Sequence, residues 1–265
     1  MSGTAEQRIR VSDEAGVVRV VLARPQARNA FDALMLDQLT AAIVHVSADA
    51  NCRALCIEAD GPVFCAGADL NWMRSSGSAT LEVNRREAQR LGHLFLALSR
   101  VPCPTLAVVQ GAALGGGAGL AAAVDIVIAA EGTRFGFSEV RLGIVPAVIS
   151  PFALRKIGHA QALRWFQSGE SFDAATAQRI GLVNELVAAE GLEACRQQVL
   201  AALRAAAPAA QRIAKQLSLA GTTQPDEELM DKLAELIAQV RSLPEAQEGL
   251  GAFLEKRPPV WSPQA

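Results

Sequence analysis

The chain has 265 residues, 51% of them apolar, and carries 25 basic and 27 acidic side chains, for a formal net charge of −2. This length allows one large core with a helical appendage. The balanced charge gives no electrostatic footprint for nucleic acid or a membrane surface. The N-terminal stretch lacks an apolar segment of signal-peptide type, and no apolar run is long enough to span a bilayer. We therefore expect a cytoplasmic protein with neither nucleic acid nor a membrane among its partners.

The cysteines give no sign of a metal or redox motif. Their number is odd, and their spacing matches neither a zinc site nor a Cys-x-x-Cys pair. The chain also has only three histidines, so we expect no metal. Free thiols in a reducing compartment are the expected state. The five cysteines are Cys52, Cys56, Cys65, Cys103 and Cys195.

The first part of the chain alternates predicted strands and helices. Apolar runs bounded by turn residues predict strands; these are residues 17–25, 53–59, 105–111 and 125–130, with a short extended piece at 133–137. Helical spacing predicts helices at 31–47, with Asp32 as N-cap, at 81–99, and in the glycine-rich stretch after Gly111. The polar segment 74–80 is expected to be a mobile loop. This repeated β–α–β order predicts an α/β fold with a mostly parallel sheet.

From Pro151 onward the pattern is mainly helical. A short helix is predicted over 173–181, with Asp173 as cap and Gly181 as stop, followed by a small strand in 182–187. The remaining residues are alanine-rich and amphipathic. We therefore divide the chain into an α/β core, residues 1–200, and a helical C-terminal region, residues 201–265.

The stretch GAALGGGAGLAAAVD, residues 111–125, places five glycines after an apolar run. Glycine inside a helix costs about 1 kcal/mol relative to alanine, so something must approach this backbone closely. A P-loop is excluded because Gly117 stands where lysine is required, and a dinucleotide fingerprint fails at Leu120. Two interpretations remain: a backbone-amide site for a carbonyl oxygen at the helix N-terminus, or close helix–strand packing alone.

A second small-residue turn follows another predicted strand. The stretch GPVFCAGADLNWM, residues 61–73, contains four small residues in a row, from Cys65 to Ala68. An oxyanion hole that takes one backbone donor from each of two turns would need two such stretches. The pair of turns therefore favours the amide site.

These stretches together resemble the enoyl-CoA hydratase/isomerase family, also called the crotonase superfamily. The resemblance covers nearly the whole chain and includes LARPQARNAF, FCAGADL, ALGGGAGL, FGFSEVRLGIVP and IGLVNELV. It implies a crotonase-like ββα spiral core with a helical C-terminal trimerisation region, and a homo-oligomer that is a trimer or a dimer of trimers. It also implies stabilisation of a thioester enolate, with coenzyme A as part of the acyl-CoA substrate and no separate cofactor.

The resemblance also implies the site residues. The N–H groups of Ala68 and Gly116 would form the oxyanion pair, and Glu139 would be the acid/base. Phe253 and Lys256 would reach the CoA of a neighbouring subunit. The residues that the resemblance assigns to substrate binding are Gln26, Ala27, Arg28, Ala66, Asp69, Leu70, Gly115, Arg141, Pro146, Ala147, Phe253 and Lys256.

One position departs from the pattern of the family. Typical hydratases carry two glutamates; the second matches Glu139, and the first falls on Gly119, where this chain has no acid. A single glutamate buried among Phe135, Phe137 and Ile144 would have a raised pKa, which suits proton transfer near neutral pH. The departure leaves open isomerisation by a single base.

The segments AGADLNWM, VQGAALGGGAGL and SEVRLGIVPAVISPF resemble a narrower set, the bacterial methylglutaconyl-CoA and isohexenylglutaconyl-CoA hydratases. This resemblance implies hydration of a 3-branched glutaconyl-CoA in leucine or acyclic terpene catabolism. The distal carboxylate of such a substrate calls for a partner, and Arg141, Arg155 and Lys156 are the candidates. The alternatives are an enoyl-CoA isomerase, a hydratase of simple enoyl-CoAs, and a non-catalytic acyl-CoA-binding scaffold.

Overall fold

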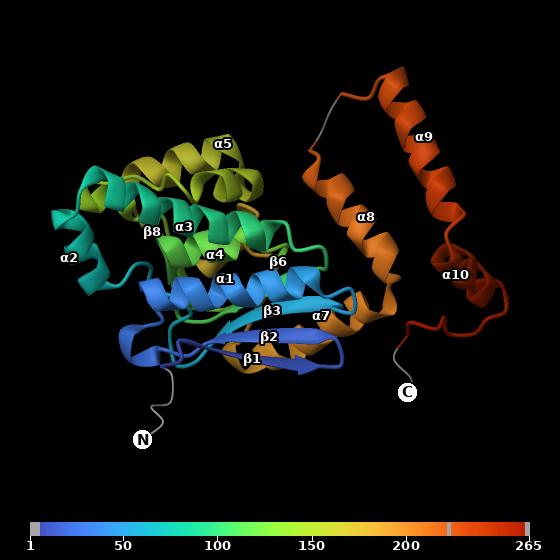
Figure 1. Ribbon diagram of the computed structural model, residues 1–265, viewed down its shortest axis with the longest axis horizontal. Helices are drawn as coiled ribbons and strands as arrows, with labels where there is room; N and C mark the ends of the chain where they lie inside the picture. The colour runs from blue at the N-terminus through green and yellow to red at the C-terminus, as the bar shows by residue number, and fades with distance from the viewer. Residues whose placement is uncertain (1–5, 222–223, 263–265) are drawn as a thin grey trace.

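The computed structural model describes residues 6–221 and 224–262, and its core is a six-stranded sheet (Figure 1). The strand order is β1-β2-β3-β4-β6-β9, in which β1 pairs antiparallel with β2 and every other pair is parallel. These strands are β1 (Ile9–Glu14), β2 (Val17–Leu22), β3 (Ala54–Ala59), β4 (Thr105–Val109), β6 (Ile126–Ala130) and β9 (Glu185–Val187). A second, three-stranded sheet holds β5 (Ala112–Leu114), β7 (Arg134–Gly136) and β8 (Ser171–Asp173).

Helices connect these strands and continue to the C-terminal end. They are α1 (Ala33–Ala48), α2 (Leu70–Ser78), α3 (Leu81–Ser99), α4 (Gly116–Ala123), α5 (Ser150–Ser168), α6 (Ala174–Arg179), α7 (Leu192–Ala205), α8 (Pro208–Leu219), α9 (Glu227–Arg241) and α10 (Pro244–Leu254). The predicted caps are confirmed, because the carboxylates of Asp32 and Asp173 accept hydrogen bonds from the Met35 and Thr176 amides at 2.8 Å. The predicted parallel α/β architecture is therefore correct.

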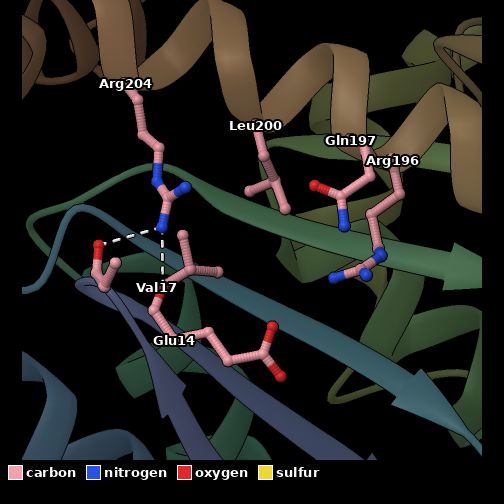
Figure 2. A pocket seen from close by; sticks show the side chains of 7 residues that line it. Glu14, Val17, Arg196, Gln197, Leu200 and Arg204 are labelled. Carbon is pink, nitrogen blue, oxygen red and sulfur yellow. Dashed lines mark hydrogen bonds between the residues drawn. The ribbon is translucent and has the colours of Figure 1, made fainter. Parts of the chain in front are cut away.

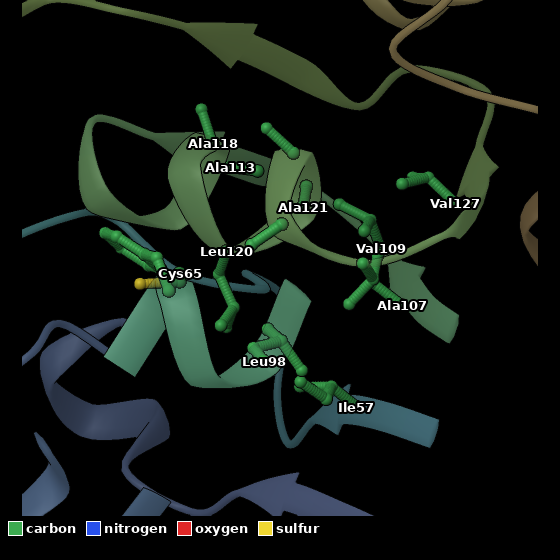
Figure 3. Packing of buried hydrophobic residues seen from close by; sticks show 14 of the residues in the cluster. Ile57, Cys65, Leu98, Ala107, Val109, Ala113, Ala118, Leu120, Ala121 and Val127 are labelled. Atoms are coloured by element: carbon green, nitrogen blue, oxygen red, sulfur yellow. The ribbon is translucent and has the colours of Figure 1, made fainter. Parts of the chain in front are cut away.

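The largest hydrophobic cluster surrounds α4. Every residue of this helix from Gly117 to Ala123 is buried, and side chains of α3, β3, β4 and β6 gather around it (Figure 3). A chain of edge-to-face rings, Phe31 to Phe95 to Phe152, extends the cluster at centroid separations of 6.4 and 6.0 Å. A smaller cluster, which includes Leu200 of α7, covers the other face of the sheet. Burial on all sides explains why α4 is built almost entirely from glycine and alanine.

Two local expectations need correction or addition. The segment 74–80 is not a loop: α2 continues through Ser78, and the Ser75 and Ser78 hydroxyls donate to the carbonyls of Trp72 and Ser75. The Asp69 carboxylate caps this helix from outside the polar segment, by accepting from the Asn71 amide at 2.8 Å. Strand β1 was not predicted. Its signal is the alternation of Ile9 and Val11 before a tight turn.

The C-terminal helices attach to the core through a few polar contacts. Arg212 donates to the Ala50 carbonyl at 2.6 Å, and Lys215 pairs with Asp125 at 2.7 Å. Helices α9 and α10 lie apart from the sheet (Figure 1). Helix α7 runs across the predicted boundary at 200/201 and packs on the sheet with Leu200. The division at that boundary stays a prediction, and α8 is the first helix that lies wholly beyond it.

The thiols are free, as predicted, and all but Cys195 are buried. The Sγ atoms of Cys52 and Cys103 lie 3.5 Å apart. Across residues 6–221 and 224–262, no cluster of His, Cys, Asp and Glu side chains could hold a metal ion. No helix in those ranges is both long and apolar enough to cross a membrane.

Candidate active site

The two glycine-containing turns meet in space. An isolated parallel bridge joins Cys65 to Ala113, with Cys65 N–H donating to Ala112 at 3.1 Å and Leu114 N–H donating to Cys65 at 3.0 Å. A Cβ atom on Gly67 would lie 3.0 Å from the Leu114 carbonyl oxygen and 3.8 Å from the Gly116 nitrogen. Gly67 also has a φ of +97°, which favours glycine. The residues preceding Ala68 are therefore packed directly against the start of α4.

The backbone N–H groups of Ala68 and Gly116 are both unengaged. A second isolated parallel bridge joins Phe31 to Ala68. In it the Phe31 N–H donates to the Gly67 carbonyl and the Asp69 N–H donates to the Phe31 carbonyl, each at 2.8 Å. The bridge therefore uses the groups on either side of Ala68 and leaves the Ala68 N–H out. Gly116 is the first residue of α4, where N–H groups have no intrahelical acceptor. Among the described residues neither amide donates a hydrogen bond. Both donors are available to a ligand oxygen.

Close packing also accounts for the glycines. A Cβ on Gly116 would lie 3.0 Å from the Phe31 ring, and one on Gly117 would lie 2.4 Å from the Cys65 carbonyl oxygen. The structure therefore supports both interpretations of this stretch: the glycines permit the tight contact, and that contact brings the two turns together.

Glu139 lies against the start of α4. It opens a 3₁₀ segment, Glu139–Leu142, that follows β7, and its Oε1 is 3.3 Å from where a Cβ on Gly115 would stand. Its Oε2 is buried and has no hydrogen-bond partner among the described residues. Burial raises the pKa of this carboxyl, against a smaller lowering by a backbone hydrogen bond. The pKa shift agrees in direction with the sequence prediction, although Ile144 is 53% exposed and only Phe135 and Phe137 are buried.

The side of the site near Gly119 has no room for an acid. A Cβ on Gly119 would lie 2.3 Å from Ile149 Cγ2 and 3.1 Å from Phe95 Cζ. Ile149 is 2% exposed and precedes α5, where its carbonyl accepts from Phe152 and Ala153. Gly115 is the N-cap of α4, and the Gly119 N–H donates to its carbonyl at 2.9 Å, so the two positions are neighbours at the start of the helix. Gly115 lies against the Glu139 carboxylate, and Gly119 lies against the apolar side chains of Ile149 and Phe95.

The predicted binding residues Gln26, Ala27 and Arg28 lie beside the turn that carries Ala68. The Ala66 amide donates to the Arg28 carbonyl at 3.0 Å, which places the turn of Gln26, Ala27 and Arg28 next to residues 65–68. Gln26 and Arg28 are exposed, and Arg28 has a φ of +51°. Leu70 is 71% exposed at the start of α2. The structure therefore places Arg28 beside Ala66, and the contact of these residues with a substrate stays a prediction.

The remaining predicted contacts are more scattered. Arg141 is exposed two residues after Glu139, and its Nε donates to the Ser168 carbonyl at 3.3 Å. Lys156 donates to the Asp125 carbonyl at 3.2 Å, beyond the end of α4 opposite Gly116, and burial lowers its pKa to about 8. Arg155 is exposed. Of the three candidates for a distal carboxylate, only Arg141 shares a segment with Glu139.

Four further residues complete the predicted binding set. Pro146 is buried, whereas Ala147 is exposed and donates to the Val145 carbonyl at 2.8 Å. In α10 Phe253 is 81% exposed, and Lys256 follows that helix with a φ of +56°. Their contact with a neighbouring subunit's CoA stays a prediction.

A separate surface cavity of about 260 Å³ lies between α7 and the β1–β2 turn (Figure 2). Its lining includes Glu14, Arg196, Leu200 and Arg204, and none of the predicted site residues contributes to it. Arg204 Nη2 donates to the carbonyls of Glu14 and Ala15 at 2.6 and 3.0 Å. This cavity is therefore distinct from the site at the two turns.

Comparisons with known proteins agree with the geometry. The family model described as "Enoyl-CoA hydratase/isomerase" matches residues 12–264. A "Putative enoyl-CoA hydratase" of Thermus thermophilus is 35% identical over 94% of this chain and 99% of its own length. The "2,3-dehydroadipyl-CoA hydratase" of Escherichia coli is 32% identical over 94% of this chain and 96% of its own length. A crystal structure of a putative enoyl-CoA hydratase/isomerase (crotonase) from Legionella pneumophila is 41% identical, covers 96% of this chain and 98% of that one, and has a TM-score of 0.93. The chain therefore belongs to the enoyl-CoA hydratase/isomerase family, the crotonase superfamily, and is an enzyme of the enoyl-CoA hydratase type.

Proposed function

We propose that this enzyme adds water across the α,β double bond of a 3-branched glutaconyl-CoA, with a methyl or isohexenyl branch, in leucine or acyclic terpene catabolism. The observation that carries the proposal is the single carboxylate at the site. Ile149 and Phe95 fill the space beside Gly119, where a second acid would otherwise hold water. A substrate with its own distal carboxylate can supply that missing polar group.

The two free amides account for activation of the thioester. Ala68 and Gly116 would donate to the carbonyl oxygen, on which negative charge grows as water adds to the β carbon. Gly116 also begins α4, whose N-terminus carries a partial positive charge. Loss of one such donor typically costs about 3–4 kcal/mol of transition-state stabilisation. Because both donors belong to the main chain, side-chain substitution cannot remove them directly.

Glu139 would carry both proton transfers in turn. As the ionised base it takes a proton from water while the oxygen bonds to the β carbon, which leaves an enolate on the amides. The protonated carboxyl then returns that proton to the α carbon, so the net change is addition of one water. The raised pKa of Glu139 suits both steps near neutral pH, because the carboxyl can then both accept and donate.

Arg141 is the side chain best placed for a distal carboxylate. It follows Glu139 in the same 3₁₀ segment, and within residues 6–221 and 224–262 the one hydrogen bond of its side chain is from Nε to the Ser168 carbonyl. A free guanidinium face forms strong bonds to carboxylates. In support, the Escherichia coli relative is named for 2,3-dehydroadipyl-CoA, a thioester of a dicarboxylic acid.

Isomerisation is the second candidate, and the same observation favours it. A single carboxylate can remove a proton from the α carbon and return it at the γ carbon, while the amides hold the enolate. A hydratase of simple enoyl-CoAs and a non-catalytic acyl-CoA-binding scaffold are further outcomes that an assay separates.

We also propose that the chain works in the cytoplasm as a trimer or a dimer of trimers. Phe253 and Leu254 of α10 are 81% and 78% exposed, which is unusual for large apolar side chains. A neighbouring copy would cover them, and it would bring Lys256 toward the CoA bound at the two turns.

A substrate panel tests the proposal. Loss of the enoyl thioester absorbance is followed with 3-methylglutaconyl-CoA, isohexenylglutaconyl-CoA and crotonyl-CoA, and 3-enoyl-CoA is followed by product chromatography. The proposal expects kcat/KM for a branched glutaconyl-CoA at least tenfold above that for crotonyl-CoA. Equal rates on crotonyl-CoA would leave no role for the distal carboxylate. Double-bond migration without hydration would establish the isomerase, and binding without turnover the scaffold.

A further inference from the structure

A partly buried chain of ion pairs adjoins the turn that carries Ala68. Arg24, which follows β2, places Nη1 at 2.8 Å from Asp69 Oδ2 and 3.4 Å from Asp32 Oδ2. The same Nη1 donates to the Ala30 carbonyl at 3.3 Å. The side chains of Arg24, Asp69 and Asp32 are 15%, 11% and 18% exposed. One guanidinium therefore links the segment before α1 to the segment before α2.

Both oxygens of the Asp69 carboxylate accept hydrogen bonds from groups of the protein. Its Oδ1 accepts from the Asn71 and Trp72 amides at 2.8 and 3.3 Å and so caps α2, while Oδ2 faces Arg24. Burial acts to raise the pKa of this carboxyl, but the Asn71 amide and Arg24 outweigh it and hold the pKa below its usual value. The side chain is thus committed to the turn, and any contact of residue 69 with substrate falls to its main chain.

Phe31 links the same segment to both oxyanion amides. Its backbone pairs with Gly67 and Asp69, on either side of Ala68, and its ring would lie 3.0 Å from a Cβ on Gly116. Arg24 bonds the residue before Phe31 and approaches the residue after it. The contacts of Arg24 therefore fall on both of the segments that form the Phe31–Ala68 bridge.

We propose that Arg24 and Asp69 are positioning residues that fix the direction of the Ala68 N–H toward the thioester oxygen. The inference rests on the proposed oxyanion role of Ala68 and Gly116. An oxyanion donor works only within about 2.7–3.1 Å of the developing charge, and a misplacement of about 1 Å can cost about 100-fold in rate. The Phe31–Ala68 bridge fixes residues 67 and 69 with two hydrogen bonds, and Arg24 adds a side-chain tie between the same two segments that limits rotation of the Ala68 peptide.

The test compares four single variants. Arg24→Met removes the tie, Arg24→Lys keeps one charge, and Asp69→Asn keeps the α2 cap oxygen while weakening the pair. Arg10→Met is the matched control, because it breaks another arginine–aspartate pair, with Asp60, away from Ala68. Each variant is assayed for kcat and KM on the preferred enoyl-CoA. The ultraviolet band of bound 3-oxoacyl-CoA enolate is titrated beside the affinity for a saturated acyl-CoA.

We expect Arg24→Met to lower kcat about 10- to 100-fold while KM changes less than about threefold. The enolate band should weaken by a similar factor, and saturated acyl-CoA affinity should stay within about twofold. Arg24→Lys and Asp69→Asn should fall between Arg24→Met and the native enzyme, and Arg10→Met should match the native enzyme. The Arg24→Met/Asp69→Asn double variant should cost less than the sum of the single losses, because the two side chains act as one unit.

Two results would overturn this inference. One is an unchanged enolate band in a folded Arg24→Met or Arg24→Lys enzyme; the other is an equal loss of enolate and saturated acyl-CoA binding, which marks general damage. If Arg24→Met does not fold, the lysine and asparagine variants decide by the same readouts. The absence of an enolate band in the native enzyme would instead refute the proposed oxyanion amides, so the two failures are distinguishable.

Discussion

Helix α4 and the C-terminal helices α8–α10 differ in how much of their apolar surface is buried. In α4 every residue after Gly116 is buried, and its own chain supplies all the neighbours. Among the described residues of α8, α9 and α10, only Ala252 is buried. Large apolar side chains such as Met230, Leu250 and Phe253 stay exposed there. The helix beside the candidate site is thus fully packed within one chain, whereas the C-terminal helices leave large apolar side chains exposed.

The largest expected effect concerns the constellation beside α4. Glu139→Gln removes the only carboxylate found against Gly115 while keeping the size of the side chain. General acid–base catalysis contributes about 10²- to 10⁴-fold, so kcat should fall by that factor with little change in acyl-CoA affinity. Steady-state kinetics and a binding titration measure the two quantities.

Glu190→Gln, which replaces an exposed carboxylate in the 3₁₀ segment that precedes α7, serves as the control for Glu139→Gln and should retain full activity. Native-like turnover by Glu139→Gln would mean that another group moves the proton, and the role assigned to Glu139 would be wrong.

The next effect contrasts glycines in the two regions. A Cβ on Gly117 of α4 would stand 2.4 Å from the Cys65 carbonyl oxygen, a backbone atom that can move only with its turn. Gly117→Ala should therefore destabilise the fold by about 1–3 kcal/mol, as overpacking of a tight core does. Gly251 of α10 has its nearest such neighbour at 4.0 Å, so Gly251→Ala should stabilise by about 0.5–1 kcal/mol through helix propensity. Chemical denaturation measures both, and equal signs would contradict the comparison.

Local sequence signals predicted the parts of the fold that depend on neighbouring residues. The helix at 81–99 has the bounds that its spacing predicted, and Asp32 caps α1 as expected. The segment 74–80 was misread because its serines and glycine favour a loop, whereas the helix begins at a cap outside that segment, Asp69. The alternating strand β1 was overlooked, although Ile9 and Val11 carried its signal.

The sequence indicated which turns form the candidate site, but it did not indicate the long-range contacts that hold those turns. The two small-residue turns are contiguous motifs, and within them the family resemblance assigned Ala68 and Gly116, an assignment that stays a prediction. The tie between Arg24 and Asp69 joins residues 45 positions apart, and composition carries no trace of it. The wedge of Ile149 against Gly119 is equally non-local. The sequence shows that an acid is missing at Gly119. Only the packing shows that the side chains of Ile149 and Phe95 occupy the space where that acid would stand.

A smaller effect on stability, with a clear effect on assembly, is expected in the C-terminal helices. Phe253→Asp places a charge at a side chain that is 81% exposed in the single chain. The unfolding free energy of the core should change by less than about 0.5 kcal/mol, as for surface substitutions elsewhere. The sedimentation coefficient should fall to that of a smaller species if a second copy covers this surface. Gln216→Asp, in α8, controls for added charge alone, and an unchanged oligomer in Phe253→Asp would refute the proposed interface.

The smallest effect is the dependence of stability on the ionisation of Glu139. Burial raises its pKa in the folded state above the unfolded value, and Oε2 has no described partner that would stabilise the charge. The protonated carboxyl is therefore favoured by folding below the unfolded pKa, and this contribution is lost as the pH rises through the folded pKa. Glu139→Gln cannot ionise and keeps a neutral side chain at every pH. Its melting temperature should exceed that of the native enzyme at pH 7.5, and the difference should shrink toward pH 4. A difference that stays constant between the two pH values would mean that the carboxylate is solvated in the folded enzyme, and the raised pKa would then lose its physical cause.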